Sequence, residues 1–353
     1  MSSDQSQQLI DAVRQSIETG VPLSIRGGDT KAFYGRQQGG TPLNVSGHAG
    51  IVNYEPTELV LTARSGTSIA EIESELADRD QMLAFEPPRF GDSATLGGAV
   101  GCGLSGPRRP FAGSVRDFVL GTRVVNGRGE DLRFGGQVMK NVAGYDVSRL
   151  MTGSLGTLGL LLEVSLKVLP KPRVECTLVR EADRNSAIEF QRHWSGKSSP
   201  ITGTCHSGSL LHVRLSGSDT AVAAARSNIG GETVEDGCEF WRTLKEHEHE
   251  FFSNPGRLWR LSLPPASPEP GLNGHSLMEW NGALRWLISD APADVIRRAA
   301  SGAGGHATLF RNDGTESDVF HPLESHLRIL HENVKLAFDP KGIFNPGRMY
   351  KGL

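Results

Sequence analysis

The glycine content constrains the fold of this chain more than any other feature. The sequence has 43 glycines in 353 residues, well above the share of about 7% in an average protein. Six of them lie in residues 91–106, GDSATLGGAVGCGLSG, which is too dense a spacing for a helix or a strand. Apolar residues are interleaved with these glycines, namely Leu96, Ala99, Val100 and Leu104. A flexible linker would lack such anchors, so we predict a long packed loop whose backbone amides face a ligand.

Two further glycine-rich stretches accompany this loop, and each of the three follows a predicted strand. The three stretches are residues 26–30 (RGGDT), 93–106 and 153–159 (GSLGTLG). Glycine tolerates positive φ, so successive backbone N–H groups can point into one concavity and bind an anion such as a pyrophosphate. Their side chains add hydroxyl donors and one fixed positive charge: Ser93, Thr95, Ser154, Thr157 and Arg26. Three such loops predict a dinucleotide threaded between two subdomains.

A Rossmann dinucleotide site is the main alternative, and its motif can be tested directly. Residues 101–106 match the bare spacing G-x-G-x-x-G, but in a Rossmann fold this motif opens a helix after an early strand. Here Pro107 and Pro110 follow at once, where that helix should run. We therefore reject the Rossmann interpretation.

The spacing of apolar residues predicts alternating helices and strands up to residue 170. Helices are expected at residues 9–17 and 68–76, the second opening with a capping box formed by Ser68 and Glu71. Strands are expected at residues 22–26, 59–63, 119–125, 130–134 and 158–169, with a hairpin turn at residues 126–129. Pro170 and Pro172 then mark the best domain boundary in the chain.

The region after this boundary changes character. Residues 173–320 have fewer glycines for their length and contain all five tryptophans: Trp194, Trp241, Trp259, Trp280 and Trp286. We expect core or interface positions for these large side chains. Strands at residues 210–215 and 282–289 and a helix at residues 293–300 predict a second α+β unit of modest size. The tail carries one more helix and ends in the turn-rich residues 339–348.

Composition excludes several classes of partner. The formal net charge of -3 and pI near 6.4 give no reason to expect nucleic acid or an anionic membrane. No apolar run reaches the roughly 18 residues that would span a bilayer, and residues 1–8 lack a secretion signal, so we expect a cytoplasmic protein without direct membrane insertion. The four cysteines, Cys102, Cys176, Cys205 and Cys238, are too scattered to hold an iron–sulfur cluster or a structural zinc.

Several of these segments, taken in order, resemble a known family. They are residues 22–30, 91–106, 113–132, 140–170 and 338–350. Together they resemble the FAD-binding domain of the vanillyl-alcohol oxidase, or PCMH, type. Within that family the chain is most similar to the FAD-binding subunits of bacterial glycolate oxidases.

The resemblance implies an α+β fold with three parts. Residues 1–172 would form a PCMH-type FAD-binding domain of two subdomains, about 1–55 and 56–172. Residues 173–320 would form a small α+β cap domain, and residues 321–353 a tail that returns to the FAD domain.

The resemblance also implies a function within a complex. Glycolate, a small 2-hydroxy acid, would be oxidised to glyoxylate, with electrons passing to an iron–sulfur subunit. A larger FAD-binding catalytic subunit would be the other partner, and any membrane association would come through these partners.

The family pattern implies cofactor contacts at matching positions. The first pyrophosphate loop would be Arg26, Gly27, Gly28, Asp29 and Thr30, and the second, against the flavin and diphosphate, Ser93, Ala94, Thr95, Leu96, Gly97 and Gly98. A segment beside the cofactor would include Lys140, Gly144, Tyr145 and Asp146. The ribose and adenine would lie along Gly153, Ser154, Gly156, Thr157, Gly159, Glu163 and Val164, and Asn345 would reach toward the isoalloxazine ring.

Two departures from the family pattern affect the chemistry. The first loop carries no His or Cys for covalent attachment, and Cys102 in the second loop is not at an attachment position, so we expect non-covalent FAD. Residues 302–311, GAGGHATLFR, hold one His and no acid, where catalytic members have a His-rich acidic motif. We therefore leave the catalytic residues unassigned and expect activity only in a complex.

Other interpretations remain open. The chain could be a self-sufficient FAD-dependent D-2-hydroxy-acid dehydrogenase, or a structural subunit with a vestigial FAD site. Arg108 and Arg109 could bind a substrate carboxylate or a partner subunit. His247 and His249 could share a metal on a strand but not on a helix, where residues two apart diverge.

Overall fold

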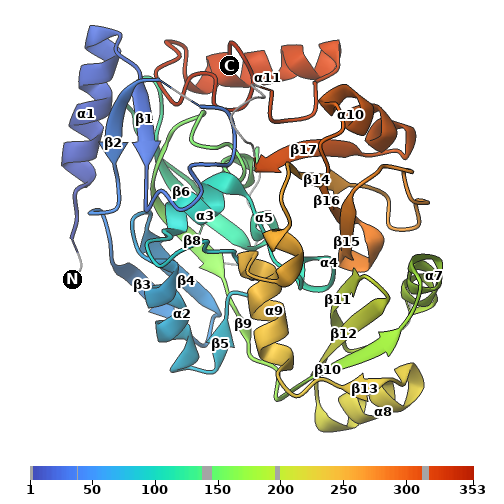
Figure 1. Ribbon diagram of the computed structural model, residues 1–353. Helices are drawn as coiled ribbons and strands as arrows, with labels where there is room; N and C mark the ends of the chain where they lie inside the picture. Colours follow the sequence, from blue (N-terminus) through green and yellow to red (C-terminus); the bar gives the residue numbers. More distant parts are fainter. Residues whose placement is uncertain (1–2, 38, 137–144, 195–198, 312–317) are drawn as a thin grey trace. The chain divides into compact units, whose positions relative to one another are not determined.

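The computed structural model describes residues 3–37, 39–136, 145–194, 199–311 and 318–353. Contacts between residues divide the chain into two compact units (Figure 1). The first unit comprises Met1–Ser105, Gly113–Pro170 and Pro322–Leu353, and the second comprises Gly106–Ala112 and Lys171–His321. Both mix helices with strands, so the predicted α+β class is confirmed.

The first unit is built on two sheets. A parallel pair, β1 (Leu23–Arg26) and β2 (Thr41–Asn44), carries the first glycine stretch at its end. An antiparallel sheet of five strands has the order β3-β4-β8-β6-β7. Its strands are β3 (Ile51–Glu55), β4 (Val60–Arg64), β6 (Val119–Val125), β7 (Asp131–Gly135) and β8 (Leu160–Lys167). Because β3 pairs with β4, the five-stranded sheet begins at residue 51, and the subdomain boundary near residue 55 stays a prediction.

Local sequence signals account for most of this unit. The turn at residues 126–129 joins β6 to β7 as a hairpin, as predicted. Ser68 caps α2 (Ile69–Ala77) by accepting a hydrogen bond from the Glu71 amide at 3.0 Å, a contact that contributes about 1 kcal/mol to a helix. Strand β8 lies at the centre of the five-stranded sheet and is buried along most of its length, which explains its apolar sequence.

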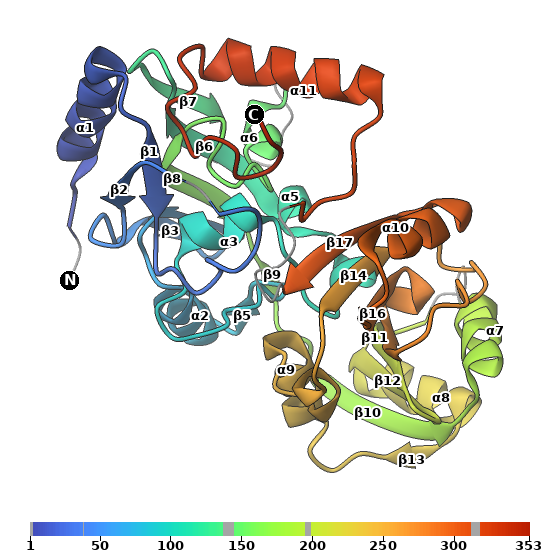
Figure 2. The same ribbon diagram turned by 45° about the horizontal axis from the view of Figure 1, so that its top comes forward.

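Helices cover the first unit from both ends of the chain. Helix α1 (Ser6–Thr19) buries Leu9, Ile10 and Val13 in a core that includes Phe344 of the C-terminal tail. Helix α11 (Ser325–Phe338) packs Val334 and Phe338 against β6 and its neighbours, and Figure 2 shows it beside β7 and α6. The remaining elements are short: β5 (Gln81–Met82), α5 (Val115–Phe118), α6 (Val147–Leu150) and β9 (Leu169–Pro170).

The prediction of a loop throughout residues 91–106 is wrong, because these residues contain α3 (Leu96–Cys102). Thr95 caps this helix through its hydroxyl, and Gly103 ends it in the left-handed conformation. A helix tolerates glycine where close packing rewards it: a Cβ at Gly97 would lie 2.8 Å from Cβ of Ser65. Tertiary contact therefore overrides the low helix propensity of this segment.

The second unit is an eight-stranded antiparallel sheet with the order β13-β10-β12-β11-β15-β16-β14-β17. Its strands are β10 (Val174–Glu181), β11 (Ile201–Ser207), β12 (Leu210–Gly217), β13 (Glu232–Thr233), β14 (Leu258–Ser262), β15 (His275–Glu279), β16 (Leu284–Ile288) and β17 (His306–Arg311). Its α-helices are α4 (Arg109–Ala112), α7 (Arg184–Trp194), α8 (Asp219–Ile229), α9 (Gly237–Glu246) and α10 (Ala293–Gly302), with short 3-10 turns at Glu250–Ser253 and Trp280–Gly282.

Two apolar cores stabilise this sheet. Helices α7 and α8 pack on the β10–β12 half, and α10 packs on the β14–β17 half around the fully buried Trp259. Two buried indole N–H groups have side-chain acceptors: Trp241 donates to Thr177 Oγ1 at 2.9 Å and Trp286 to Glu279 Oε2 at 2.8 Å. The expectation that the tryptophans are core anchors is confirmed for Trp241, Trp259 and Trp286.

Residues 106–112 belong to the second unit, although the sequence placed them in the first domain. The Arg108 guanidinium donates to Glu175 Oε2 at 2.7 Å, and the pair is largely buried. Arg109 stacks over the Trp280 ring, whose indole N–H donates to the Gly106 carbonyl at 3.1 Å. The residues that make these contacts lie far apart in the sequence, so a local sequence pattern could not predict them.

Candidate functional site

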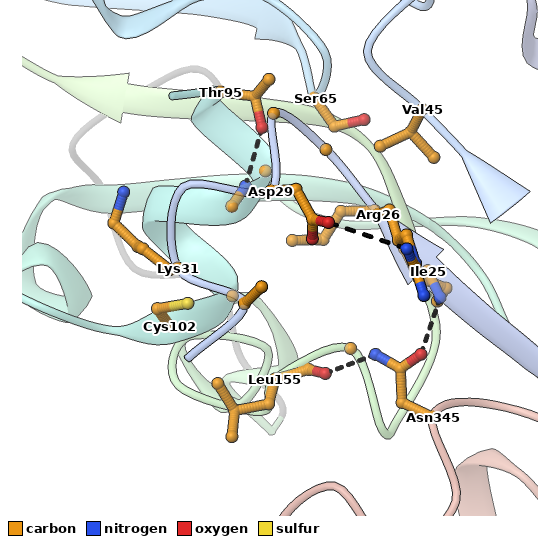
Figure 3. A pocket seen from close by; sticks show the side chains of 18 of the residues that line it. Ile25, Arg26, Asp29, Lys31, Val45, Ser65, Thr95, Cys102, Leu155 and Asn345 are labelled. Atoms are coloured by element: carbon orange, nitrogen blue, oxygen red, sulfur yellow. Dashed lines mark hydrogen bonds and ion pairs between the residues drawn. The ribbon is translucent and has the colours of Figure 1, made fainter. Parts of the chain in front are cut away.

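A cavity of the first unit lies where the three glycine stretches meet the C-terminal tail. It has a volume of about 430 Å³, and Figure 3 shows the residues that surround it. The walls come from β1 and the first stretch, from α3, from the third stretch and the start of β8, and from the tail at Asn345 and Arg348. The three glycine stretches and the tail, which the sequence analysis identified separately, therefore line the same cavity.

The first two stretches touch each other through their backbones. A Cβ at Gly28 would lie 1.5 Å from the Ser93 carbonyl oxygen, and a Cβ at Gly27 would lie 2.3 Å from Thr95 Oγ1. The Ser93 hydroxyl donates to the Gly28 carbonyl at 2.7 Å, which locks the two loops together. Glycine is thus required at residues 27 and 28 by close approach.

The charged residues of the first stretch lie toward solvent. Arg26 and Asp29 form an ion pair at 3.7 Å with about half of each side chain exposed. Such a pair is well screened and contributes little to stability. Because this ion pair lies at the cavity, the negative charge of Asp29 partly offsets the positive charge of Arg26.

Asn345 joins two walls of the cavity. Its side-chain oxygen accepts from the Ile25 amide at 2.7 Å, and its amide nitrogen donates to the Leu155 carbonyl at 2.7 Å. A Cβ at Gly156 would lie 2.8 Å from that amide nitrogen, so the third stretch packs directly on the tail. Asn345 therefore acts as a bracket between β1 and the third glycine stretch.

Two more residues of the C-terminal region hold the cavity walls. The Lys335 side chain is 12% exposed, and its ammonium donates to the Thr157 carbonyl at 2.7 Å, to Phe344 O at 2.9 Å and to Asp339 Oδ2 at 2.6 Å. Burial lowers the pKa of Lys335, and Asp339 opposes that shift. Arg348 donates to backbone carbonyls after the first stretch, including Tyr34 O at 2.7 Å and Ala32 O at 3.0 Å.

The cavity is positively charged overall. Its lining includes Arg26, Lys31 and Arg348 against a single acid, Asp29. Figure 3 places Lys31 and Cys102 on one side of the cavity and Ile25, Arg26 and Val45 on the other, so a cation lies on each side and apolar side chains lie beside Arg26. A long ligand with an anionic group and an apolar ring would match these surroundings.

Comparison with known proteins supports this description. A family described as an FAD binding domain matches residues 3–135. The chain is 52% identical over 351 residues to the glycolate oxidase subunit GlcE of Escherichia coli (strain K12), with 99% of each chain covered. The chain belongs to the GlcE family of FAD-binding proteins.

More distant relatives of this GlcE-family chain cover less of it. The glycolate oxidase subunit GlcD of Bacillus subtilis (strain 168) is 33% identical over 162 residues, 45% of this chain and 34% of its own length. A D-lactate dehydrogenase of Anaerostipes hadrus is 29% identical over 177 residues, 49% of this chain and 37% of its own. An alkyldihydroxyacetonephosphate synthase structure superimposes with a TM-score of 0.67 at 14% identity, covering 98% of this chain and 76% of that one, and shares the fold.

FAD is the cofactor of this GlcE-family protein, and the cavity fits it. FAD carries a diphosphate with two negative charges, and the lining has an excess of two positive charges. The glycine backbones of the first two stretches border the same space as these cations. The donors that a diphosphate needs are therefore present around one cavity.

The structure distributes the predicted site residues over three groups. Those that line the cavity are Arg26, Gly27, Gly28, Asp29, Thr30, Thr95, Gly97, Gly98, Gly156, Gly159 and Asn345. Those that lie outside its lining are Ser93, Ala94, Leu96, Asp146, Gly153, Ser154, Thr157, Glu163 and Val164. Lys140 and Gly144 lie outside the described residues. The individual cofactor contacts remain predictions.

Several residues outside the lining have structural partners. Glu163 pairs with Arg123 at 2.7 Å and Arg133 at 3.0 Å across the five-stranded sheet. Asp146 caps α6 by accepting from the Arg149 amide at 3.1 Å. Both acids therefore stabilise the fold around the site.

The sequence did not single out several residues that line the cavity, among them Lys31, Ser65, Leu155 and Arg348. Lys31 directly follows the first stretch, so its position next to a predicted anion loop was an available signal. Arg348 lies in the resembling tail segment, but its carbonyl partners lie more than 300 residues away in sequence. Only the structure connects those residues.

The histidines of the second unit are not arranged around a metal. His247 ends α9 in the left-handed conformation and stacks on the Phe252 ring at 3.8 Å, while His249 accepts from the Phe251 amide. Among the residues that the structure describes, no group of three or more His, Cys, Asp or Glu could hold a metal ion. His306 begins β17 and is exposed.

Proposed function

We propose that this chain is the FAD-binding subunit of a multi-subunit glycolate oxidase that converts glycolate to glyoxylate. The observation that carries the proposal is 52% identity over nearly the whole length of both chains to a protein named as a subunit of glycolate oxidase. A D-lactate dehydrogenase among the relatives supports the wider class of hydroxy-acid oxidoreductases. When bound, FAD supplies the group that accepts the two electrons from the hydroxy acid.

In this proposal the chain holds FAD without a covalent bond. The glycine backbones at residues 27, 28, 97 and 98 would surround the diphosphate, and the tail would keep these walls in place. Cys102 is a thiol in the cavity lining, and burial raises its pKa. A thiol with a raised pKa is a poor nucleophile, which supports non-covalent binding.

Electrons would leave through partner subunits. The four cysteines of this chain lack the spacing of iron–sulfur ligands, so the cluster is assigned to a separate iron–sulfur subunit. A larger FAD-binding subunit would complete the complex and would contribute the catalytic residues. Within the described part of the chain, no helix has the length and apolarity to cross a membrane. In this proposal the protein is cytoplasmic, and any membrane association comes through its partner subunits.

The test compares the isolated chain with the reconstituted complex. The isolated chain should show the visible absorbance of oxidised flavin, and acid precipitation should release that colour into the supernatant. Glycolate added without oxygen should leave the flavin of the isolated chain oxidised, whereas glycolate should reduce a dye in the presence of the full complex.

Two results would contradict the proposal. Bleaching of the isolated chain by glycolate or D-lactate would favour the second candidate, a self-sufficient D-2-hydroxy-acid dehydrogenase. A chain that stays colourless after incubation with FAD, yet still joins the complex, would indicate a structural subunit instead.

A further inference from the structure

Ser65 is a buried serine in the wall of the FAD cavity. It directly follows β4, it is 1% exposed, and it is one of the residues that line the cavity. Figure 3 shows it between Thr95 and Val45, with its hydroxyl directed toward Val45. Ser65 therefore places a polar group at the edge of the cavity, where bulk water hardly reaches it.

The hydroxyl of Ser65 has no hydrogen-bond partner among the residues that the structure describes. A buried hydroxyl loses its hydrogen bonds to water, and most buried polar groups in folded proteins regain a partner from a neighbouring group. Because Ser65 lines the cavity, a ligand bound there could supply the partner.

The backbone of Ser65 is held on both sides. Its amide donates to the Leu162 carbonyl of β8 at 2.8 Å, and its carbonyl accepts from the Gly97 amide of α3 at 2.7 Å. These bonds fix the Cα position, whereas rotation about the Cα–Cβ bond still moves the hydroxyl among three staggered positions. The hydroxyl can therefore turn toward a ligand without any change in the backbone.

The two other hydroxyls of the described lining already take part in hydrogen bonds. Thr95 Oγ1 accepts from the Gly98 amide at 3.3 Å and caps α3. Thr30 Oγ1 accepts from Lys31 Nζ at 3.3 Å. Ser65 differs from both because its side chain has no such role in the wall itself.

Ser65 lies in a deeply buried part of the cavity. Val45 beside it is 4% exposed, and Leu160 at the start of β8 is fully buried, whereas Arg26 and Asp29 of the first glycine stretch are exposed. A substrate or an electron acceptor has to reach the flavin ring, but nothing has to reach the adenosine. The buried part therefore suits adenosine, whose adenine has apolar faces and polar edge atoms.

We propose that the Ser65 hydroxyl hydrogen-bonds to the adenosine half of FAD. The hydroxyl would donate to a ring nitrogen of adenine or bond to a hydroxyl of the ribose. The inference rests on FAD as the cofactor and does not depend on glycolate being the substrate.

The first measurement is the affinity of the apoprotein for FAD, ADP and riboflavin, in the wild type and in Ser65→Ala. The loss of one hydrogen bond should weaken FAD and ADP by roughly 10-fold, which corresponds to about 1.4 kcal/mol. Riboflavin lacks the adenosine half, so its affinity should stay at the wild-type value.

The second measurement is thermal unfolding with and without FAD. Ser65→Ala removes a buried hydroxyl that has no protein partner, so the melting temperature of the apoprotein should stay the same or rise. The increase in melting temperature on adding FAD should be smaller than in the wild type, because the variant binds FAD more weakly. A purely structural hydroxyl would instead lower the melting temperature of the apoprotein when removed.

Thr122→Val is the matched control. Thr122 lies on β6, is 4% exposed, and has a hydroxyl without a partner among the described residues, but it lies outside the cavity lining. The variant should keep the wild-type affinities for all three ligands, and its apoprotein should not melt at a lower temperature.

Three results would overturn the inference. In the first, Ser65→Ala keeps wild-type affinity for FAD and ADP. In the second, it weakens all three ligands equally and lowers the melting temperature of the apoprotein, which would make the hydroxyl part of the fold. In the third, riboflavin loses affinity and ADP does not, which would place Ser65 at the flavin half. The wild type binds FAD in every case, so the proposed glycolate oxidase function would stand.

Discussion

At the scale of single residues, the cavity depends on glycines, which have no side chain, as much as on the residues whose side chains line it. Gly27 and Gly28 let the first two stretches come into contact, and Gly101 leaves space on the cavity side of α3. A Cβ at Gly101 would meet no other atom within 4 Å. The same residue type therefore serves two purposes, close backbone packing and room for a ligand.

Gly28→Ala should damage the site by forcing two loops apart. The added Cβ would lie 1.5 Å from the Ser93 carbonyl oxygen, and overpacking of this kind costs about 1–3 kcal/mol or more. FAD affinity and the melting temperature of the apoprotein should both fall. Gly39→Ala is the matched control, because a Cβ there meets nothing within 4 Å. Unchanged FAD affinity in Gly28→Ala would contradict the role of this contact.

Gly101→Leu should separate binding from folding. The side chain would enter the cavity space, so the variant should lose FAD while its apoprotein melts at or above the wild-type temperature, since helical glycine is destabilising by about 0.5–1 kcal/mol. Titration with FAD and thermal unfolding of the apoprotein would measure both effects. Wild-type FAD affinity in this variant would show that the cofactor does not occupy the space beside Gly101.

His212 should make the second unit sensitive to acid. Burial, together with the charges of His249 and His206, lowers the pKa of His212 to about 4 from a usual value of 6.5. The unfolded chain therefore binds the proton more readily, so stability is fully present above pH 6.5 and falls as the pH drops toward about 4. The contribution of this one group to the slope is at most about 1.4 kcal/mol per pH unit.

Unfolding in denaturant at several pH values, followed by tryptophan fluorescence, would test this expectation. His212→Gln should reduce the pH dependence without abolishing it, because burial also lowers the pKa of His206 and His249. His326→Gln, at an exposed site on α11, should keep the wild-type slope. A wild-type slope in His212→Gln would contradict the assignment.

At the scale of elements, the sequence predicts the helices and turns that depend on neighbouring residues. It does not predict the elements and contacts that depend on residues far apart in the sequence. Ser68 and the turn at residues 126–129 are local signals, and both led to correct elements. Helix α3 was missed because glycine lowers helix propensity, whereas the Thr95 cap and the packing of Gly97 on Ser65 favour the helix. The cavity was anticipated from its loops, but the bracket formed by Asn345 depends on partners at residues 25 and 155.

Asn345→Ala should weaken the site through this bracket. It would leave the Ile25 amide and the Leu155 carbonyl without their side-chain partner, at a cost of about 1–3 kcal/mol for each buried group. We expect a lower melting temperature and weaker FAD binding. Asn333→Ala, at an exposed position of α11, is the control. If both variants bind FAD equally well, the tail does not organise the cavity.

At the scale of the whole molecule, the two units can be observed separately. All five tryptophans lie in the second unit, whereas the FAD cavity lies in the first. Tryptophan fluorescence therefore reports on the second unit, and flavin absorbance reports on the first.

Deletion of residues 339–353 should affect these two signals differently. The deletion removes Asp339, Asn345 and Arg348, so flavin binding should be lost, while the tryptophan transition in denaturant should stay near its wild-type midpoint. A shift of both signals together would show that the second unit depends on the tail.

The order of the chain also separates the two halves of the cavity wall. The first glycine stretch directly follows β1, yet Asn345 and Arg348, which hold it in place, lie more than 300 residues later in the sequence. The cavity is therefore complete only when the tail has docked, so a ligand that binds there also stabilises the docked tail.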